Sequence, residues 1–162
     1  MGLMTGKRGL IMGVANDRSL AWGIAKKLGG EGAELAFSYQ GEALEKRVRP
    51  LAESLSQATG GVPHLYDCDV GSDESMDALF ADLGRVWPTI DFLVHAIGFS
   101  DKNELRGLYA ETSRANFLMS MDISVYSFTA VARRAAAMMP DGGSLLTLSY
   151  YGAEKVVPHY NV

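Results

Sequence analysis

Short apolar segments alternate with amphipathic segments along the whole chain, and this alternation constrains the fold more than any other feature. The apolar segments have the length of β-strands and lie at 9–13, 33–39, 64–70, 91–98 and 144–149. Apolar residues recur at helical spacing in four further segments. The first begins at Leu20 and ends at the glycines that start with Gly29, and the others lie at 42–57, 72–86 and 113–139. Because strands that alternate with helices form parallel sheets with crossover connections, we expect a doubly wound α/β fold.

Composition and charge narrow the class of protein. The chain is 48% hydrophobic and 21% charged, which is typical of one ordered domain, and we assign that domain to residues 1–162. The net charge of -4 provides no basic field for a phosphate backbone, so we expect no nucleic-acid partner.

The cysteine count and the hydropathy pattern bear on location. Cys68 is the only cysteine, so we expect neither an intrachain disulfide nor a thiolate metal site, and a reducing compartment fits. The sequence shows no apolar core of a signal peptide and no apolar stretch of bilayer length, so we expect a cytoplasmic protein with no membrane partner.

The segment from Gly13 to Ser19 connects the first predicted strand to the first predicted helix. A glycine there removes the side chain that would block close backbone approach, and a helix start offers free amides and a positive dipole end. We expect Ser19 to cap this helix. The usual G-x-G-x-x-G spacing is absent, so an ordinary turn is the alternative, but the position after the first strand favours a Rossmann-type dinucleotide site.

Polar and small residues follow the next strands at the same edge of the predicted sheet. Gln40 ends the second strand and can bond ribose hydroxyls, and no arginine lies nearby to hold a 2′-phosphate, which favours NADH over NADPH. Asp69 and Val70 end the third strand, and Asp69 can accept the adenine amino hydrogens. We expect His95 to be a buried, hydrogen-bonded residue of the fourth strand rather than a catalyst.

Taken together and in order, these motifs resemble the short-chain dehydrogenase/reductase superfamily, and within it the bacterial NADH-dependent enoyl-acyl-carrier-protein reductases of fatty-acid synthesis. The resemblance covers essentially the whole chain. The residues that carry it are Gly13 with Ser19 to Ala25, Ser38-Tyr39-Gln40, Cys68-Asp69-Val70, His95-Ala96-Ile97-Gly98-Phe99, and Leu148-Ser149-Tyr150 with Tyr160-Asn161-Val162.

The resemblance implies an NADH site and a pair of catalytic tyrosines. The implied cofactor residues are Gly13, Ala15, Ser19, Leu20, Gln40, Asp69, Val70, Ala96, Ile97, Gly98 and Ile123. Tyr150 would line the substrate pocket, and Tyr160 would stabilise the enolate that forms when hydride adds to carbon 3 of a trans-2-enoyl thioester. The substrate would be carried by acyl carrier protein.

The end of the chain departs from the family pattern. A lysine expected seven positions after Tyr160 would fall beyond Val162, together with the last two of the usual seven strands. We therefore expect a carboxyl-terminally incomplete polypeptide with negligible turnover and weakened NADH affinity, and a homotetramer for the complete protein.

Two alternatives stay open. One is a carbonyl reductase of the same superfamily, which is disfavoured because such enzymes have a lysine four positions after the catalytic tyrosine, and Tyr160 is followed by only two residues. The other is a non-catalytic nucleotide-binding module.

Overall fold

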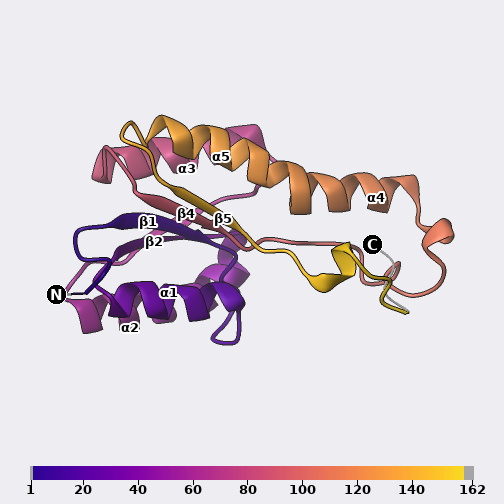
Figure 1. The fold of residues 1–162 in the computed structure, drawn as a ribbon, viewed down its shortest axis with the longest axis horizontal. Coiled ribbons are helices and arrows are strands. Elements are labelled where there is room, and N and C mark those ends of the chain that lie inside the picture. Colours follow the sequence, from indigo (N-terminus) through magenta and orange to yellow (C-terminus); the bar gives the residue numbers. More distant parts are fainter. Residues whose placement is uncertain (1, 159–162) are drawn as a thin grey trace.

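A single parallel sheet forms the centre of the computed structural model, which describes residues 2–158 (Figure 1). Its strands are β1 (Arg8–Met12), β2 (Glu34–Tyr39), β3 (His64–Asp67), β4 (Phe92–His95) and β5 (Ser144–Thr147). The order across the sheet is β3-β2-β1-β4-β5, and every neighbouring pair is parallel. The predicted doubly wound α/β fold is confirmed, and the strand order reverses between β1 and β4, where such folds bind ligands.

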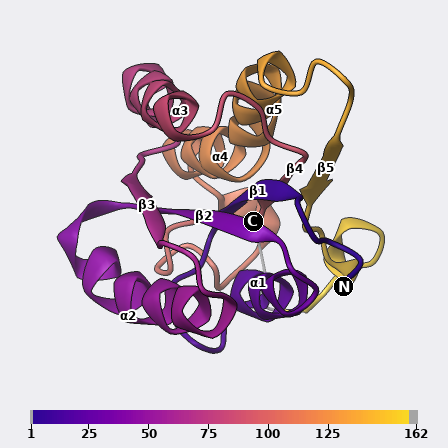
Figure 2. The same cartoon turned by 90° about the vertical axis from the view of Figure 1, so that its left-hand side faces the viewer.

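Helices cover both faces of this sheet (Figure 2). α1 (Leu20–Gly30) and α2 (Gly41–Thr59) lie on one face. α3 (Asp73–Val86) and α5 (Ser127–Ala137) lie on the other, and α4 (Arg114–Met121) extends past the end of the sheet (Figure 1). Each face has its own hydrophobic core, because successive side chains of a strand point to opposite faces. In β1, Leu10 and Met12 pack beneath α3 and α5, whereas Ile11 packs against α1 and α2.

The strands end earlier than the sequence predicted. β3 stops at Asp67 rather than at residue 70, because Asp69 begins a turn in which its Oδ1 accepts the N–H of Gly71 at 2.9 Å. β4 stops at His95 rather than at residue 98, because β1 turns away at Gly13 and leaves the later residues without a neighbouring strand. The residues beyond both strands are therefore free to line a pocket.

The long helical segment predicted at 113–139 contains a change of helix type. A π-helical turn, η2 (Asp122–Tyr126), lies between α4 and α5. Ser113 caps α4 by accepting the N–H of Asn116 at 3.1 Å. Single turns of 3-10 helix, η1 (Tyr109–Glu111) and η3 (Tyr151–Ala153), lie in the connection between β4 and α4 and in the segment after β5.

A nearly buried arginine joins α3 to α5. The Arg134 side chain is only 9% exposed, and its Nε and Nη2 lie 2.6 and 2.9 Å from carboxylate oxygens of Asp77 and Asp73. Its Nη1 also donates to the carbonyl of Ala130 at 3.1 Å. These charge-assisted bonds fix the two helices relative to each other.

Replacing Arg134 by alanine should lower the free energy of unfolding by about 1.5 to 3 kcal/mol, because bonds to charged groups are lost at a buried position. Arg133 precedes it on α5 and is exposed, so Arg133→Ala is the matched control and should change stability by less than about 0.5 kcal/mol. Urea unfolding of both variants measures the difference, and equal losses would contradict this role for Arg134.

Candidate functional site

A cavity of about 460 Å³ lies at the carboxyl ends of the strands, beside the reversal of strand order. Nine of the eleven predicted cofactor residues line it: Gly13, Ala15, Gln40, Asp69, Val70, Ala96, Ile97, Gly98 and Ile123. They come from five separate segments of the chain, and the fold brings them together. The volume is within the range of pockets for small molecules and cofactors.

Gly13 sets the depth of this cavity. Its φ of 99° lies in the region that favours glycine, and a Cβ at this position would overlap the carbonyl oxygen of Ala96. The backbone that leaves β1 therefore packs directly on the backbone that leaves β4.

Ser19 has a different role from the one predicted. Its side chain caps no amide of α1, and its Oγ instead accepts the N–H groups of Ala15 and Asn16 at 3.0 and 3.1 Å. Its hydroxyl has two acceptor positions, and both are used, so it can interact with a further group only as a donor. Ser19 occupies the N-cap position of α1, as predicted, but the capping bond is absent because a serine at this position can bond back into the preceding loop as well as forward.

The start of α1 supplies further donors. Trp22 and Gly23 direct their N–H groups to the carbonyl of Ser19, whereas the N–H groups of Leu20 and Ala21 precede the first intrahelical bond. Leu20 has a 74% exposed side chain and, like Ser19, does not line the cavity. The side chain of Leu20 therefore forms no part of the cavity wall. Its backbone N–H belongs to the amino-terminal end of α1.

Polar groups line the side of the cavity formed by β2 and β3. Gln40 is exposed at the end of β2, and Gly41 donates its N–H to Asp67 at 2.8 Å, which orders the turn beside it. Asp69 has one carboxylate oxygen engaged by Gly71. Among the described residues that line the cavity, Asp69 is the only charged one.

The opposite wall comes from the π-helical turn η2. Ile123 lines the cavity, and Ser124 holds the turn against the segment after β4. Its Oγ accepts the N–H of Phe99 at 3.0 Å and donates to the Phe99 carbonyl at 3.2 Å. Sequence reasoning missed the π turn and Ser124, because the i→i+5 pattern leaves no period in the sequence, although such turns often mark functional sites.

Six lining residues were not among the predicted site residues: Val14, Ser38, Tyr39, Leu44, Cys68 and Phe99. They flank the predicted residues, so extending each motif by one position would have found most of them. Burial raises the pKa of Cys68 to about 11, so its thiol stays protonated at neutral pH and is no nucleophile.

His95 is buried at the end of β4, as predicted. Its side chain is 1% exposed, its Nε2 lies 2.8 Å from the Ser127 Oγ, and its Nδ1 lies 3.2 Å from the Thr147 Oγ1. Burial lowers its pKa, so the ring is neutral near pH 7.

The two predicted tyrosines lie outside this cavity or outside the described residues. Tyr150 lies shortly after the end of β5. Its side chain is 58% exposed and is not among those that line the cavity. Tyr160 lies outside residues 2–158, so its placement stays a prediction.

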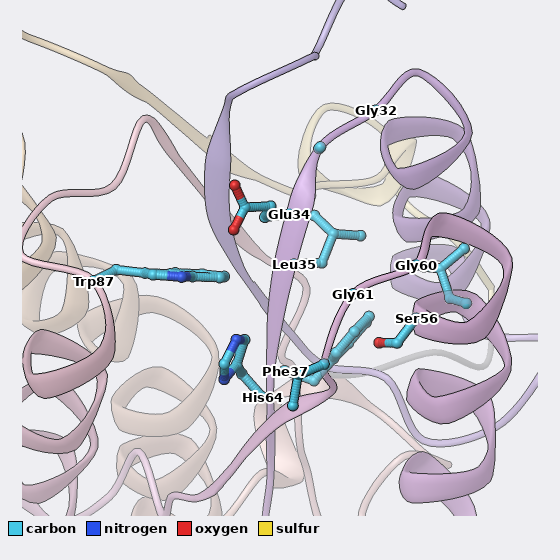
Figure 3. A pocket seen from close by; sticks show the side chains of 12 residues that line it. Gly32, Glu34, Leu35, Phe37, Ser56, Gly60, Gly61, His64 and Trp87 are labelled. Atoms are coloured by element: carbon cyan, nitrogen blue, oxygen red, sulfur yellow. The ribbon is translucent and has the colours of Figure 1, made fainter.

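A second cavity, of about 360 Å³, lies at the opposite end of the sheet (Figure 3). Ser56 and Gly60 reach it from the end of α2, and Trp87 reaches it from the other side of β2. His64 packs edge-on against Trp87, with ring centroids 4.9 Å apart. This cavity contains none of the predicted site residues and lies away from the carboxyl ends of the strands.

Within residues 2–158, no three histidine, cysteine or acidic side chains gather as a metal site would require. No helix in that part of the chain has the length and apolar character needed to cross a membrane.

A doubly wound parallel sheet with a glycine turn and a pocket at its switch point defines a Rossmann-type protein of the dinucleotide-binding class. Residues 13–162 match the model of the enoyl-(acyl carrier protein) reductase family. The chain belongs to this family.

Individual relatives agree with this assignment. An enoyl-acyl-carrier-protein reductase (NADH) of Rhizobium meliloti is 62% identical over 99% of this chain and 57% of its own length. The reductase of Anaplasma phagocytophilum, solved in complex with NAD, is 58% identical with a TM-score of 0.92 over 99% of this chain and 60% of that one. The Bacillus cereus enzyme, solved with NADP+ and indole naphthyridinone, is 45% identical with a TM-score of 0.95 over 99% and 62%. This chain therefore spans about three fifths of the length of these relatives.

Substituting Gly13 by alanine should destabilise the fold by about 2 to 5 kcal/mol, because the new methyl group meets the Ala96 backbone at a strained φ. Gly23, inside α1, has open space around its Cβ position and is the matched control. Gly23→Ala should raise stability by about 0.5 to 1 kcal/mol. Thermal and urea unfolding test this pair, and a Gly13→Ala protein as stable as the parent would refute the close contact.

Acid should destabilise the protein below about pH 6.5, the pKa of a histidine in the unfolded chain. Burial lowers the pKa of His95 and of His64, so below that pH the unfolded state binds protons that the folded state does not. Each histidine then costs up to about 1.4 kcal/mol per pH unit. Urea unfolding between about pH 5 and 7.5 measures this slope.

Two variants separate the contributions of His95 and His64 to the pH dependence of stability. A folded His95→Phe protein should show a flatter dependence than a His64→Phe protein, because His95 is buried more deeply. An unchanged slope in His95→Phe would show that His95 has the same pKa in the folded and unfolded states.

Proposed function

We propose that the cavity at the carboxyl ends of the strands binds NADH, and that the chain carries the cofactor site of an enoyl-acyl-carrier-protein reductase. The observation that carries this proposal is the gathering of nine predicted cofactor residues in one cavity at the switch point. Family membership supports it, because the Rhizobium meliloti relative is named as an NADH enzyme. The relative from Anaplasma phagocytophilum was solved with NAD.

Donors beside the glycine turn fit a pyrophosphate. The Ser19 hydroxyl can act only as a further donor, and the N–H groups of Leu20 and Ala21 lie at the positive end of α1. Gly13 leaves the approach open because it has no side chain. The loop amides of Ala15 and Asn16 are bonded to Ser19, so the helix start rather than the loop would bind the phosphates.

The lining favours an adenosine without a 2′-phosphate. Gln40 would bond the ribose hydroxyls, and the carboxylate oxygen of Asp69 that Gly71 does not use would accept the adenine amino group. The described lining contains no arginine or lysine to pair with a phosphate. The Bacillus cereus relative was solved with NADP+, so family membership alone does not decide between the two cofactors.

The proposed reaction is the reduction of a trans-2-enoyl thioester carried by acyl carrier protein. NADH bound in the cavity would supply a hydride to carbon 3 of the substrate and leave as NAD+, and carbon 2 of the resulting enolate would take a proton from solvent. Tyr160 would donate a hydrogen bond to the thioester carbonyl oxygen, where negative charge develops, and Tyr150 would line the substrate pocket. Both roles rest on the motif that follows β5.

We also propose that the chain is one domain and that the protein assembles as a homotetramer. Apolar side chains of α4 and η2 support the assembly, because Leu118, Val125 and Tyr126 are all more than half exposed. A cytoplasmic location is proposed from the single cysteine, which needs no oxidising compartment.

Fluorescence titration with each cofactor tests the site. The parent chain should bind NADH more tightly than NADPH, and Gln40→Arg should shift this preference toward NADPH by about tenfold, because a guanidinium pairs with the 2′-phosphate. Gln57 lies exposed near the far end of α2, and Gln57→Arg is the matched control with the same added charge. Absence of NADH binding by the parent chain would refute the proposed cofactor site.

Substrate choice tests the reaction. In the full-length protein, oxidation of NADH by crotonyl thioester but not by simple ketones supports the enoyl reductase. The reverse pattern would favour a carbonyl reductase, and binding of NADH without oxidation by either would favour a nucleotide-binding module.

A further inference from the structure

A chain of hydrogen bonds runs from β5 through β4 to the wall of the cavity. Thr147 of β5 contacts one ring nitrogen of His95, and Ser127 of α5 contacts the other. Ser127 also donates to the carbonyl of Ile123 at 2.6 Å, and Ile123 lines the cavity. Three elements and the π-helical turn η2 are thereby joined through one buried imidazole.

The direction of each hydrogen bond follows from the Ile123 carbonyl, which is the last acceptor in the series. A carbonyl only accepts, so the single proton of the Ser127 hydroxyl points to Ile123. The Ser127 oxygen must then accept from His95, which puts the ring proton on Nε2. Nδ1 of the neutral ring therefore accepts from the Thr147 hydroxyl.

This bonding pattern bears on the shape of η2. A serine that bonds the carbonyl four residues earlier tends to bend or open the helix, and the turn opened here contains Ile123. Ser124 holds the same turn from the other side through both backbone groups of Phe99. Ile123 is thus fixed between two polar contacts, one of which depends on His95.

A purely structural role would not require an imidazole at this position. β4 is a central strand with apolar neighbours on both faces, and burying a polar ring there is unfavourable unless both nitrogens are bonded. Both nitrogens are bonded, Nδ1 to Thr147 of the exposed strand β5 and Nε2, through Ser127, to the cavity wall.

We infer that His95 is a positioning residue: through Ser127 it holds η2 in the π-helical form that places Ile123 against the cofactor. The inference rests on the proposed function in one respect, namely that the occupant of the cavity is NADH. His95 itself is buried and does not line the cavity.

Ser127→Ala tests the inference, with Ser120→Ala as the matched control. Both serines are buried on the same helical segment, but Ser120 contacts Asn116 and lies outside the cavity. Ser127→Ala should weaken NADH binding about fivefold, whereas Ser120→Ala should stay within about twofold of the parent chain. Equal affinities in the two variants would overturn the inference.

The exposed end of the network gives a second variant that does not disturb the core. Thr147→Val removes only the donor to Nδ1, on a strand whose residues are exposed. Nitrogen NMR of the parent should show His95 protonated at Nε2 alone. Thr147→Val should keep this tautomer, because Ser127 fixes it, whereas Ser127→Ala should mix the two neutral tautomers. A parent ring protonated at Nδ1 would contradict the bond directions.

Amide hydrogen exchange separates failure of this inference from failure of the proposed function. If the parent chain does not bind NADH, the proposed function is contradicted, but exchange at residues 122–126 still measures how firmly η2 is held. Faster exchange there in Ser127→Ala than in Ser120→Ala supports the positioning role. The same exchange in both variants overturns it.

Discussion

The contact between Gly13 and the backbone of Ala96 is the constraint on which the rest of the site depends. It lets β1 turn away at the level where β4 ends, so that the strands diverge and a cavity forms between the segments that follow them. Any side chain at residue 13 would separate these segments. The positions of Ala96, Ile97 and Gly98 in the wall therefore follow from the absence of one methyl group.

Much of the fold could be predicted because its central strands are buried on both faces. β1 and β4 read as continuous apolar segments, and glycine or polar residues mark the turns that follow them. The strand ends could not be predicted as well, because a strand ends where its neighbour leaves it. β4 loses β1 after Met12, and no local feature of the later residues shows this.

The sequence predicted which residues line the candidate site better than it predicted the hydrogen bonds that they make. Strand ends in a parallel sheet lie at one edge, so Gln40, Asp69 and Ala96 could be grouped from topology alone. The role of Ser19 could not, because its hydroxyl can bond in either direction. Nor could the π turn at Ile123, since its i→i+5 pattern leaves no period in the sequence and Ser124 meets Phe99 only in the folded chain.

The separation of the core into two layers gives the molecule two independent optical reporters. The chain has two tryptophans, with Trp22 in the layer beneath α1 and Trp87 in the layer beneath α3. Trp22 packs near Phe37 and Trp87 near His64, so the two indoles sense different surroundings. With one indole removed at a time, the emission of the other would follow the melting of its own side of the sheet and show whether both sides are lost in a single cooperative step.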